Sequence, residues 1–392
     1  MKSKVLFAVL ILCTAVSAFS QEEVLPVVRN TTLSTGVFFQ AWSIEKSVSP
    51  ITQVSFPVHI VMPLKPDMHL SVTHTPSLSW WYDDTRLSGL SDTWVQAAYV
   101  FFNDKVMADV GIGIPTGKTR MTNTEYELSR VLSKRVYQFK TPVTGQGFCA
   151  KAGLAGAYDI TEWMVLGLGA SYIKKTAYHP VTYEYTYQYS QDSTVTTQWE
   201  GKYRPGDELT FNVGCDFSVS ESVKIMFDVL YTRYGKDERD GSQVFSAGDR
   251  FDVNLGLFWR MSDSRFMWAH AVLRQSGKNE LMQGLYFKQE TENTNGPQAD
   301  LDINYKAIPF KDGGLFLLAE GRFYGRNEEG WGGAQVIGGG LRMSYNFSQS
   351  SSFFAQIKYF GGALKGFLTD TGIDDSVSLE GFELGGGFTF TF

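Results

Sequence analysis

Gly381-Phe-Glu-Leu-Gly-Gly-Gly-Phe-Thr-Phe-Thr-Phe392, the last twelve residues of the chain, alternate between two kinds of position. One face carries Phe382, Leu384, Phe388, Phe390 and Phe392, with Gly386 as its only gap, and the other carries Glu383, Thr389 and Thr391 among glycines. Because successive side chains of a β-strand point to opposite faces, this period of two predicts a strand with one apolar and one polar face. A strand of a soluble sandwich seldom ends the polypeptide on an exposed aromatic residue, where fraying is expected.

The opposite end of the chain has the pattern of a secretory signal peptide. Residues 1–20 combine two lysines, an apolar run from Val5 to Leu12 and small residues at the exit. We therefore expect a cleaved signal peptide at 1–20, a short periplasmic segment at 21–32 and a barrel at 33–392.

Hydropathy and composition limit the class of membrane protein to which the chain can belong. After the signal peptide no apolar run reaches the length of a spanning helix, and a mean hydropathy of -0.15 excludes a helical membrane protein. Aromatic residues at 15% and 39 glycines suit the girdles and curved strands of a barrel. The net charge of -6 gives no reason to expect a nucleic-acid partner.

Period-two stretches recur along the chain, and they predict an all-β protein, a transmembrane antiparallel β-barrel of about sixteen strands, or fourteen. We expect strands at 33–46, 51–63, 67–81, 91–102, 105–114, 145–158, 161–174, 206–219, 222–234, 249–261, 264–276, 299–310, 313–325, 334–347, 351–362 and 380–392. Short turns alternate with long loops at 82–90, 115–144, 175–205, 235–248, 277–298, 326–333 and 363–379. Such alternation is typical of short periplasmic turns and long extracellular loops.

The terminal strand also resembles the closing strand of bacterial outer-membrane β-barrels, whose assembly machinery recognises a final aromatic residue. The resemblance implies that Phe392 is the assembly signal and that the chain lies in outer-membrane lipid.

The same alternation predicts a polar lumen of mixed sign. Charges on the lipid face cost about 2–4 kcal/mol for Arg or Lys at mid-bilayer, so charged strand residues are expected to face inward. The candidate lumen residues are Lys151, Asp216, Asp228, Asp252, Arg260, Glu320, Arg322, Arg342 and Lys358. Those on the three consecutive strands after residue 313 form either an ion-pair ladder that braces the wall or a patch that selects the solute.

No pattern predicts a catalytic, cofactor or metal site, and we expect no enzyme. The five histidines lack the spacing of metal ligands, and no Ser, His and acid set stands out. Gly111 to Thr119 looks like a phosphate-binding loop, but position 112 is Ile where that motif needs Gly, and no helix is expected after it.

Three short stretches contain glycine at characteristic places: Leu87 to Tyr99, Gly111 to Gly117 and the run Arg204-Pro-Gly-Asp-Glu-Leu209. They resemble the outer-membrane family associated with phenol meta-pathway degradation, which is grouped loosely with fatty-acid and toluene transporters. The resemblance covers residues 67–234 and implies passive uptake of small apolar compounds. The fatty-acid transporters carry an N-terminal hatch, whereas only residues 21–32 precede the first strand here, so either inward-folded loops close the lumen or it is open.

Alternating tyrosines make the loop at 175–205 a candidate ligand site. Tyr183, Tyr185, Tyr187 and Tyr189 alternate with polar residues, which predicts a hairpin that continues the barrel wall. Hydroxyl-bearing rings suit aromatic, hydrocarbon or sugar ligands, but cross-strand tyrosines also stabilise exposed hairpins.

Pro57 lies in mid-strand, where it removes a ladder hydrogen bond and is tolerated only at an edge or a bulge. A closed barrel has no edges, so we expect a bulge or kink there. It is either a lateral opening for solute or a bulge that only adds curvature.

Three functions remain open from the sequence. The first is a passive channel for small, largely hydrophobic solutes, aromatic or hydrocarbon. The second is a general or sugar-selective diffusion porin, and the third is a barrel enzyme or adhesin that uses its loops.

Overall fold

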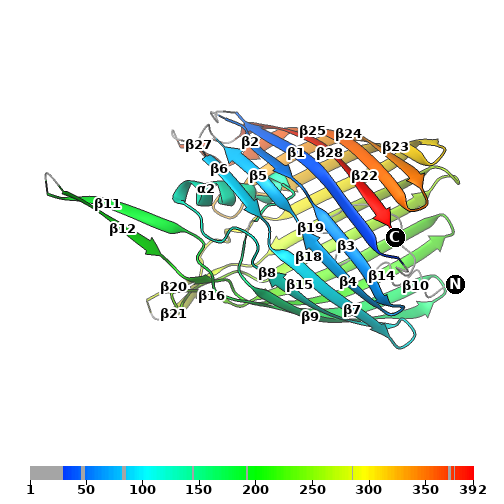
Figure 1. Cartoon of the computed structure of the whole chain (residues 1–392), viewed down its shortest axis with the longest axis horizontal. Helices are drawn as coiled ribbons and strands as arrows, with labels where there is room; N and C mark the ends of the chain where they lie inside the picture. The colour runs from blue at the N-terminus through cyan, green and yellow to red at the C-terminus, as the bar shows by residue number, and fades with distance from the viewer. Residues whose placement is uncertain are drawn as a thin grey trace.

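The computed structural model describes residues 30–45, 49–81, 85–143, 145–190, 193–284, 286–369, 372–374 and 376–392 (Figure 1). The expected signal peptide and most of the segment at 21–32 lie outside the described residues.

Sixteen antiparallel strands form one closed barrel, as the period-two pattern predicts. They are β1 (Thr32–Ile44), β2 with β3 (Ile51–Ser55, Val58–Lys65), β4 with β5 (Met68–His74, Pro76–Trp81), β6 with β7 (Thr85–Leu90, Thr93–Phe101), β8 (Val106–Ile114), β9 (Cys149–Thr161), β10 (Met164–Lys175), β14 (Glu208–Ser220), β15 (Val223–Tyr234), β18 (Arg250–Arg260), β19 (Phe266–Ser276), β22 (Gln298–Phe310), β23 (Gly313–Tyr324), β24 (Gly333–Ser348), β25 (Ser351–Lys365) and β28 (Val377–Thr391).

The terminal strand closes the barrel by pairing with the first. β28 runs antiparallel to β1 in an unbroken register from Thr32 opposite Thr391 to Ile44 opposite Leu379. Each of the two strands therefore pairs with the backbone N–H and C=O groups that the other would otherwise leave exposed at a sheet edge. A sheet that spans a membrane requires this closure.

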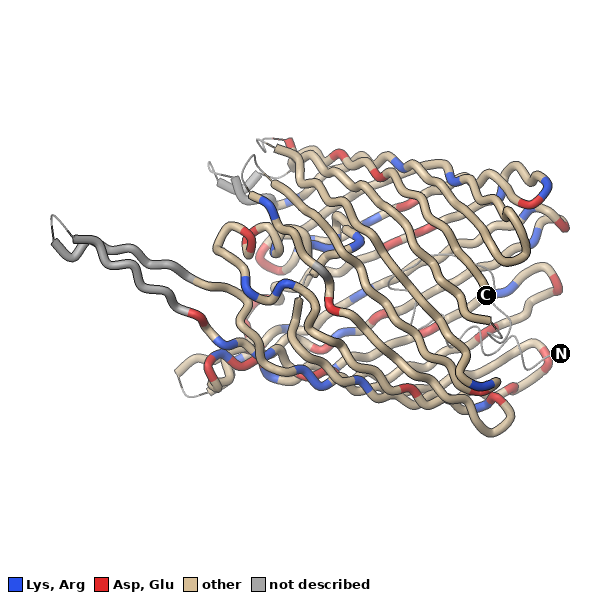
Figure 2. The backbone as a smooth tube through the Cα atoms, in the orientation of Figure 1, with Lys and Arg blue, Asp and Glu red and all other residues tan. Residues whose placement is uncertain are grey.

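Side chains of β28 alternate as expected between a lipid face and an inner wall. Leu384 is 51% exposed and Phe388 42% exposed on the outside, whereas Glu383, next to Leu384, is 4% exposed. Apolar groups thus cover the exterior and polar groups line the interior, while charged residues are dense at both ends of the barrel (Figure 2). This distribution is that of a barrel surrounded by lipid.

Short connections lie at one end of the barrel, called here the turn end, where β1 begins and β28 ends. The other end, the loop end, carries the remaining elements (Figure 1). These are α2 (Asn123–Leu132), the 3-10 helix η1 (Arg135–Tyr137), the pair β11 (Thr182–Ser190) and β12 (Ser193–Glu200), the sheet of β13 (Tyr203–Arg204), β16 (Lys236–Arg239), β17 (Ser242–Ser246), β20 (Glu280–Gln283) and β21 (Tyr286–Gln289), and the pair β26 (Phe367–Thr369) and β27 (Gly372–Asp374).

Six of the expected loops contain regular structure among the described residues. Those at 235–248, 277–298 and 363–379 hold the short strands given above, and the other three differ as follows. The prediction of a loop at 82–90 is wrong from residue 85 onward, because β6 pairs with β5 and extends the barrel wall. The segment at 115–144 contains α2, which no period-two pattern predicts. The loop at 175–205 forms the expected hairpin, but β11 and β12 make a sheet of their own and do not continue the barrel wall.

No helix among the described residues is long and apolar enough to cross a membrane.

Candidate functional site: the lumen and its plug

Residues 115–143 and 145–148, called here the plug, fold into the barrel at the loop end (Figure 1). Thr122 starts α2 with a capping box: its hydroxyl accepts from the N–H of Glu125, and the Glu125 carboxylate accepts from the N–H of Thr122 at 3.0 Å. Leu128 and Leu132, one turn apart, are buried. The sequence Thr122-Asn-Thr-Glu125, which precedes these two leucines, is a signal for the start of a helix. The period-two pattern that predicts strands does not include this signal.

An apolar cluster seats the plug against the inner wall. From the plug, Leu128, Leu132, Val136, Tyr137 and Phe139 join wall residues that include Trp42, Ile51, Val336, Phe360 and Leu379. The ring of Trp42 lies 5.7 Å from Tyr137 and 5.2 Å from Phe360, measured between centroids. This burial raises the pKa of the Tyr137 hydroxyl. The plug is therefore held by the burial of apolar surface, the dominant favourable term in such packing.

Two glutamine side chains latch the plug to β1 and β2. Gln40 donates to the carbonyl of Gln138 at 3.1 Å and accepts from the N–H of Lys140 at 2.9 Å. Gln53 donates to the carbonyl of Thr141 at 2.9 Å and accepts from the N–H of the same residue at 2.9 Å. Each amide satisfies one backbone donor and one backbone acceptor, as a neighbouring strand would.

A charged network lies on the inner wall around the plug. Glu320 bonds Arg322 at 3.1 Å and also pairs with Lys358, which lies 3.6 Å from Glu383. The Arg322 guanidinium lies over the rings of Trp42 and Phe360, and it donates to the carbonyl of Val136 in the plug.

The plug also contributes charges to this wall. Lys140 lies 3.8 Å from Glu383, and Arg135 bonds Asp300 at 2.6 Å. Tyr324 donates to the same carboxylate at 2.7 Å. Gln40, Gln53, Arg135 and Asp300 were not among the predicted site residues. A polar residue on an inner face gives no sign of its partner across the barrel, and Arg135 lies in a segment that was expected to be a loop.

The predicted lumen residues all lie at inner-facing positions of the register, but they do not form one site. Lys151 pairs with Asp109 at 3.0 Å, and Asp252 accepts from Arg250 at 2.9 Å and from Arg274. The Arg342 guanidinium lies over the ring of Phe354. Asp216, Asp228 and Arg260 lie at positions of β14, β15 and β18 whose side chains alternate toward the interior. Glu320, Arg322 and Lys358 are joined in the network described above.

The wall is interrupted at three neighbouring strands. Between β2 and β3 the break falls at Phe56 and Pro57, between β4 and β5 at Thr75, and between β6 and β7 at residues 91–92. Phe38 faces Ser55 and Thr35 faces Val58, so the register is the same on both sides of Pro57.

The feature at Pro57 is therefore a kink without an extra residue. The register shift lies two strands further on, where Thr73 faces Trp94 but Pro76 faces Leu90. Backbone hydrogen bonds still cross the interruption, including Gly36 N–H to the Pro57 carbonyl at 3.2 Å.

Both ends of the plug are attached beside this interruption. The Asp92 carboxylate accepts from the N–H of Gly117 at 3.1 Å and from the N–H of Gln146 at 2.7 Å. The stretch Gly111 to Thr119 therefore ends one strand and enters the plug, and its glycine amide binds a carboxylate of this chain.

The tyrosine side chains of the predicted ligand loop lie outside the described part of the structure. The backbone register places Tyr185 opposite Thr197 and Tyr187 opposite Val195.

A closed barrel with an apolar exterior, a polar inner wall and an inward-folded segment defines a plugged transmembrane β-barrel. No family model matches the sequence, and no curated protein matches it.

Among solved structures, the chain is similar to the CymD monoaromatic hydrocarbon channel, with 13% identity, a TM-score of 0.45 and coverage of 93% of this chain and 88% of that one. It is also similar to a FadL homologue from Pseudomonas aeruginosa, with 8% identity, a TM-score of 0.44 and coverage of 93% and 90%. For an outer-membrane channel from Pseudomonas putida F1 the values are 11%, 0.35, 94% and 97%.

Proposed function

We propose that this chain is a passive channel of the bacterial outer membrane that admits small, largely hydrophobic solutes. The observation that carries the proposal is the apolar cluster inside the loop end, where plug residues such as Leu128 and Phe139 pack on Trp42 and Phe360 of the wall. A diffusion porin keeps a polar, water-filled lumen. These side chains are buried while the plug is seated, and movement of the plug away from the wall would uncover them, which favours hydrocarbons and aromatic compounds over sugars as solutes.

The proposal includes a side exit, because a hydrophobic solute gains nothing by crossing a polar lumen when lipid is adjacent. The kink at Pro57 lies on the part of the wall where the neighbouring strands are also interrupted. Asp92 attaches both plug ends at that place, so movement of the plug and movement of the wall would be coupled. The alternative is that the kink only adds curvature to the wall.

A channel of this kind also has a defined cellular location. The barrel would lie in outer-membrane lipid after export with a cleaved signal peptide, and the assembly machinery would recognise Phe392. We assign the chain no reaction and no cofactor.

Solute uptake by cells that produce the protein tests the channel, because toluene crosses the phospholipid of a liposome without any protein. Such cells should take up toluene faster than cells without the protein and should gain no uptake of glucose, and planar bilayers with the purified protein should show small or rare openings. A variant with residues 119–143 replaced by a short Gly-Ser linker should show larger and steadier conductance, since the plug would be gone. Large steady openings of the unaltered protein, with equal passage of glucose, would indicate a diffusion porin and contradict the proposal.

A further inference from the structure

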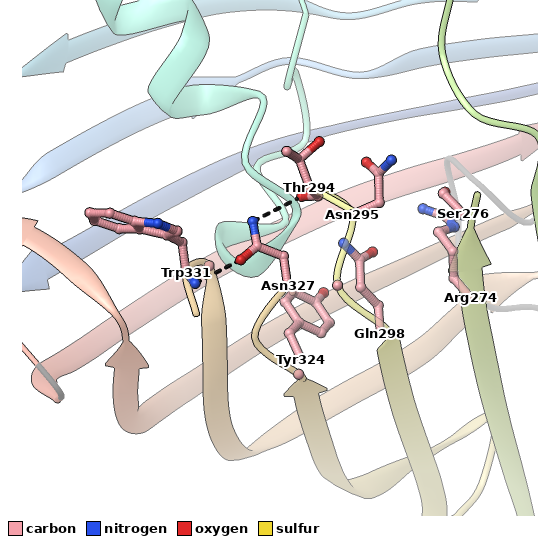
Figure 3. A pocket seen from close by; sticks show the side chains of 11 residues that line it. Arg274, Ser276, Thr294, Asn295, Gln298, Tyr324, Asn327 and Trp331 are labelled. Carbon is pink, nitrogen blue, oxygen red and sulfur yellow. Dashed lines mark hydrogen bonds between the residues drawn. The ribbon is translucent and has the colours of Figure 1, made fainter. Parts of the chain in front are cut away.

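The inner faces of β19, β22 and β23 change in character between the two ends of the barrel. At the loop end these strands border a pocket of about 170 Å³ that is lined mainly by polar side chains, where Asn327 bonds Thr294 and Trp331 (Figure 3). Near the turn end the same strands carry aromatic rings on their inner faces. The lumen therefore has a second apolar surface, at the end opposite to the plug.

Strand alternation places the residues of this surface on the lumen side. Trp259, between Phe258 and Arg260, is 43% exposed on the lipid face, so its two neighbours point inward. The register sets Phe258 opposite Trp268 and Arg260 opposite Phe266, and residues that face one another across a strand pair share a face. On the next pair, Lys306 lies opposite Phe316, beside the outward Leu317. The surface, called here the inner belt, consists of Phe258, Arg260, Phe266, Trp268, Lys306 and Phe316.

The side chains of the inner belt converge on Phe266. The centroid of its ring lies 5.8 Å from that of Phe258 and 5.8 Å from that of Phe316. The Lys306 Nζ lies 5.7 Å from the same centroid. These aromatic side chains are half-buried, so part of each ring is open to the lumen. Four neighbouring strands thus build one continuous aromatic surface with a cation at its edge.

The inner belt is basic as well as aromatic. Within the described ranges no ion pair joins Lys306 or Arg260 to a carboxylate. On the inner faces of β22 and β23 the nearest acids are Asp302, four residues from Lys306, and Glu320, four residues from Phe316. Four residues of strand span roughly 13 Å, and Glu320 is already bonded in the network around the plug. The two cations therefore stand beside the rings with no described acid to balance them.

Rings beside unbalanced cations suit a solute that has an aromatic ring and a single negative charge. The ring can pack on Phe258 and Phe266 while the anionic group reaches Lys306 and Arg260, as basic side chains do in pores that select anions. Such a solute cannot leave sideways, because transfer of an ionised carboxylate into apolar surroundings is costly. Its route leads through the turn end, where Arg260 ends β18 and Phe266 begins β19.

We propose that the inner belt binds monocyclic aromatic carboxylates and gives the channel a second class of solute, which leaves through the turn end. The ring lies on Phe266 and Phe258, and the carboxylate is held by Lys306 and Arg260. The binding site stands on its own contacts, whereas its part in passage rests on the proposed function.

Isothermal titration of the full-length protein in a nonionic detergent tests the site. Benzoate is the probe, benzamide is its uncharged analogue of the same shape, and acetate is the charge without the ring. Benzoate should bind at least tenfold more tightly than either. Lys306→Gln should raise the Kd for benzoate about tenfold, the effect of one charge-assisted hydrogen bond. Phe266→Leu should raise it about fivefold through the lost ring contact.

Two matched controls lie close to the inner belt but off its face. Lys311→Gln removes a cation from the exposed turn between β22 and β23, and Trp259→Leu removes a ring from the lipid face beside Phe258. Both should leave the Kd unchanged. Heat-modified migration on gels checks that each variant folds, and Phe316→Leu replaces Phe266→Leu if that variant does not.

Three results would overturn the inference: no binding of benzoate, equally tight binding of benzamide or acetate, or a Kd that Lys306→Gln and Phe266→Leu leave unchanged. Uptake by cells that produce the protein separates the site from the channel. Uptake of toluene without binding of benzoate rejects the inner belt and keeps the channel. Binding of benzoate without uptake of either compound rejects the channel and keeps the site, and uptake of benzoate that Lys306→Gln does not slow rejects the route through the inner belt.

Discussion

The two glutamine latches give the sharpest test of how the plug is held. Replacing both residues, Gln40→Leu with Gln53→Leu, keeps the side-chain size close to that of glutamine and removes every hydrogen bond that these amides make to plug backbone atoms. The apolar seat around Trp42 is left in place. The double variant therefore separates polar latching from apolar packing.

The structure sets the size of the expected effect. Four hydrogen bonds join the two amides to the backbone of Gln138, Lys140 and Thr141. At a net value of about 1 kcal/mol each, their loss weakens the seated plug by about 4 kcal/mol. A change of that size shifts the ratio of released to seated plug by roughly a thousandfold, so a state that is rare in the unaltered protein becomes readily observed.

Single-channel recording in planar bilayers measures the result. The double variant should open far more often than the unaltered protein, and its heat-modified migration should be retained, because the barrel ladder is untouched. Gln356→Leu is the matched control: it is another inward glutamine that bonds Glu383 at 2.6 Å and makes no described contact with the plug. An open probability that stays the same in the double variant and the control would refute the latch.

Further expected outcomes concern the wall and its assembly. Deletion of Phe392 should lower the amount of membrane-assembled protein and leave periplasmic aggregates, as fractionation would show. Pro57→Val should restore a ladder hydrogen bond and add about 1 kcal/mol of stability by thermal gel shift; unchanged hydrocarbon uptake would then leave the kink as curvature alone. Glu320→Gln should destabilise the barrel by about 3–5 kcal/mol, because Lys358 and Arg322 lose a buried partner. Tyr185→Ser with Tyr187→Ser should slow uptake of aromatic compounds; an equal loss for a sugar would make the hairpin face structural.

The course of the barrel could be predicted from the sequence because its signal is local. Whether a side chain faces lipid or lumen depends only on its place in a strand, and a run of twelve residues such as 381–392 contains that information in full. The expected strands at 313–325 and 351–362 accordingly match β23 and β25 closely, and the inward assignment of Glu320 agrees with the register. The prediction of a loop at 82–90 was wrong because residues 85–90 show no clear alternation of apolar and polar residues. They become a strand only by pairing with β5.

The plug and the charge pairs were decided only by the tertiary structure. Gln40 and Glu383, which bond one another at 2.9 Å, are 343 positions apart, and they meet because β1 and β28 close the barrel. Arg135 and Asp300 meet because a loop turns inward. The sequence alone determined a lipid-facing barrel with a polar interior, since alternation is encoded residue by residue. Which polar groups pair, and what fills the lumen, depends on closure and on loop packing, and no single stretch of this chain encodes either.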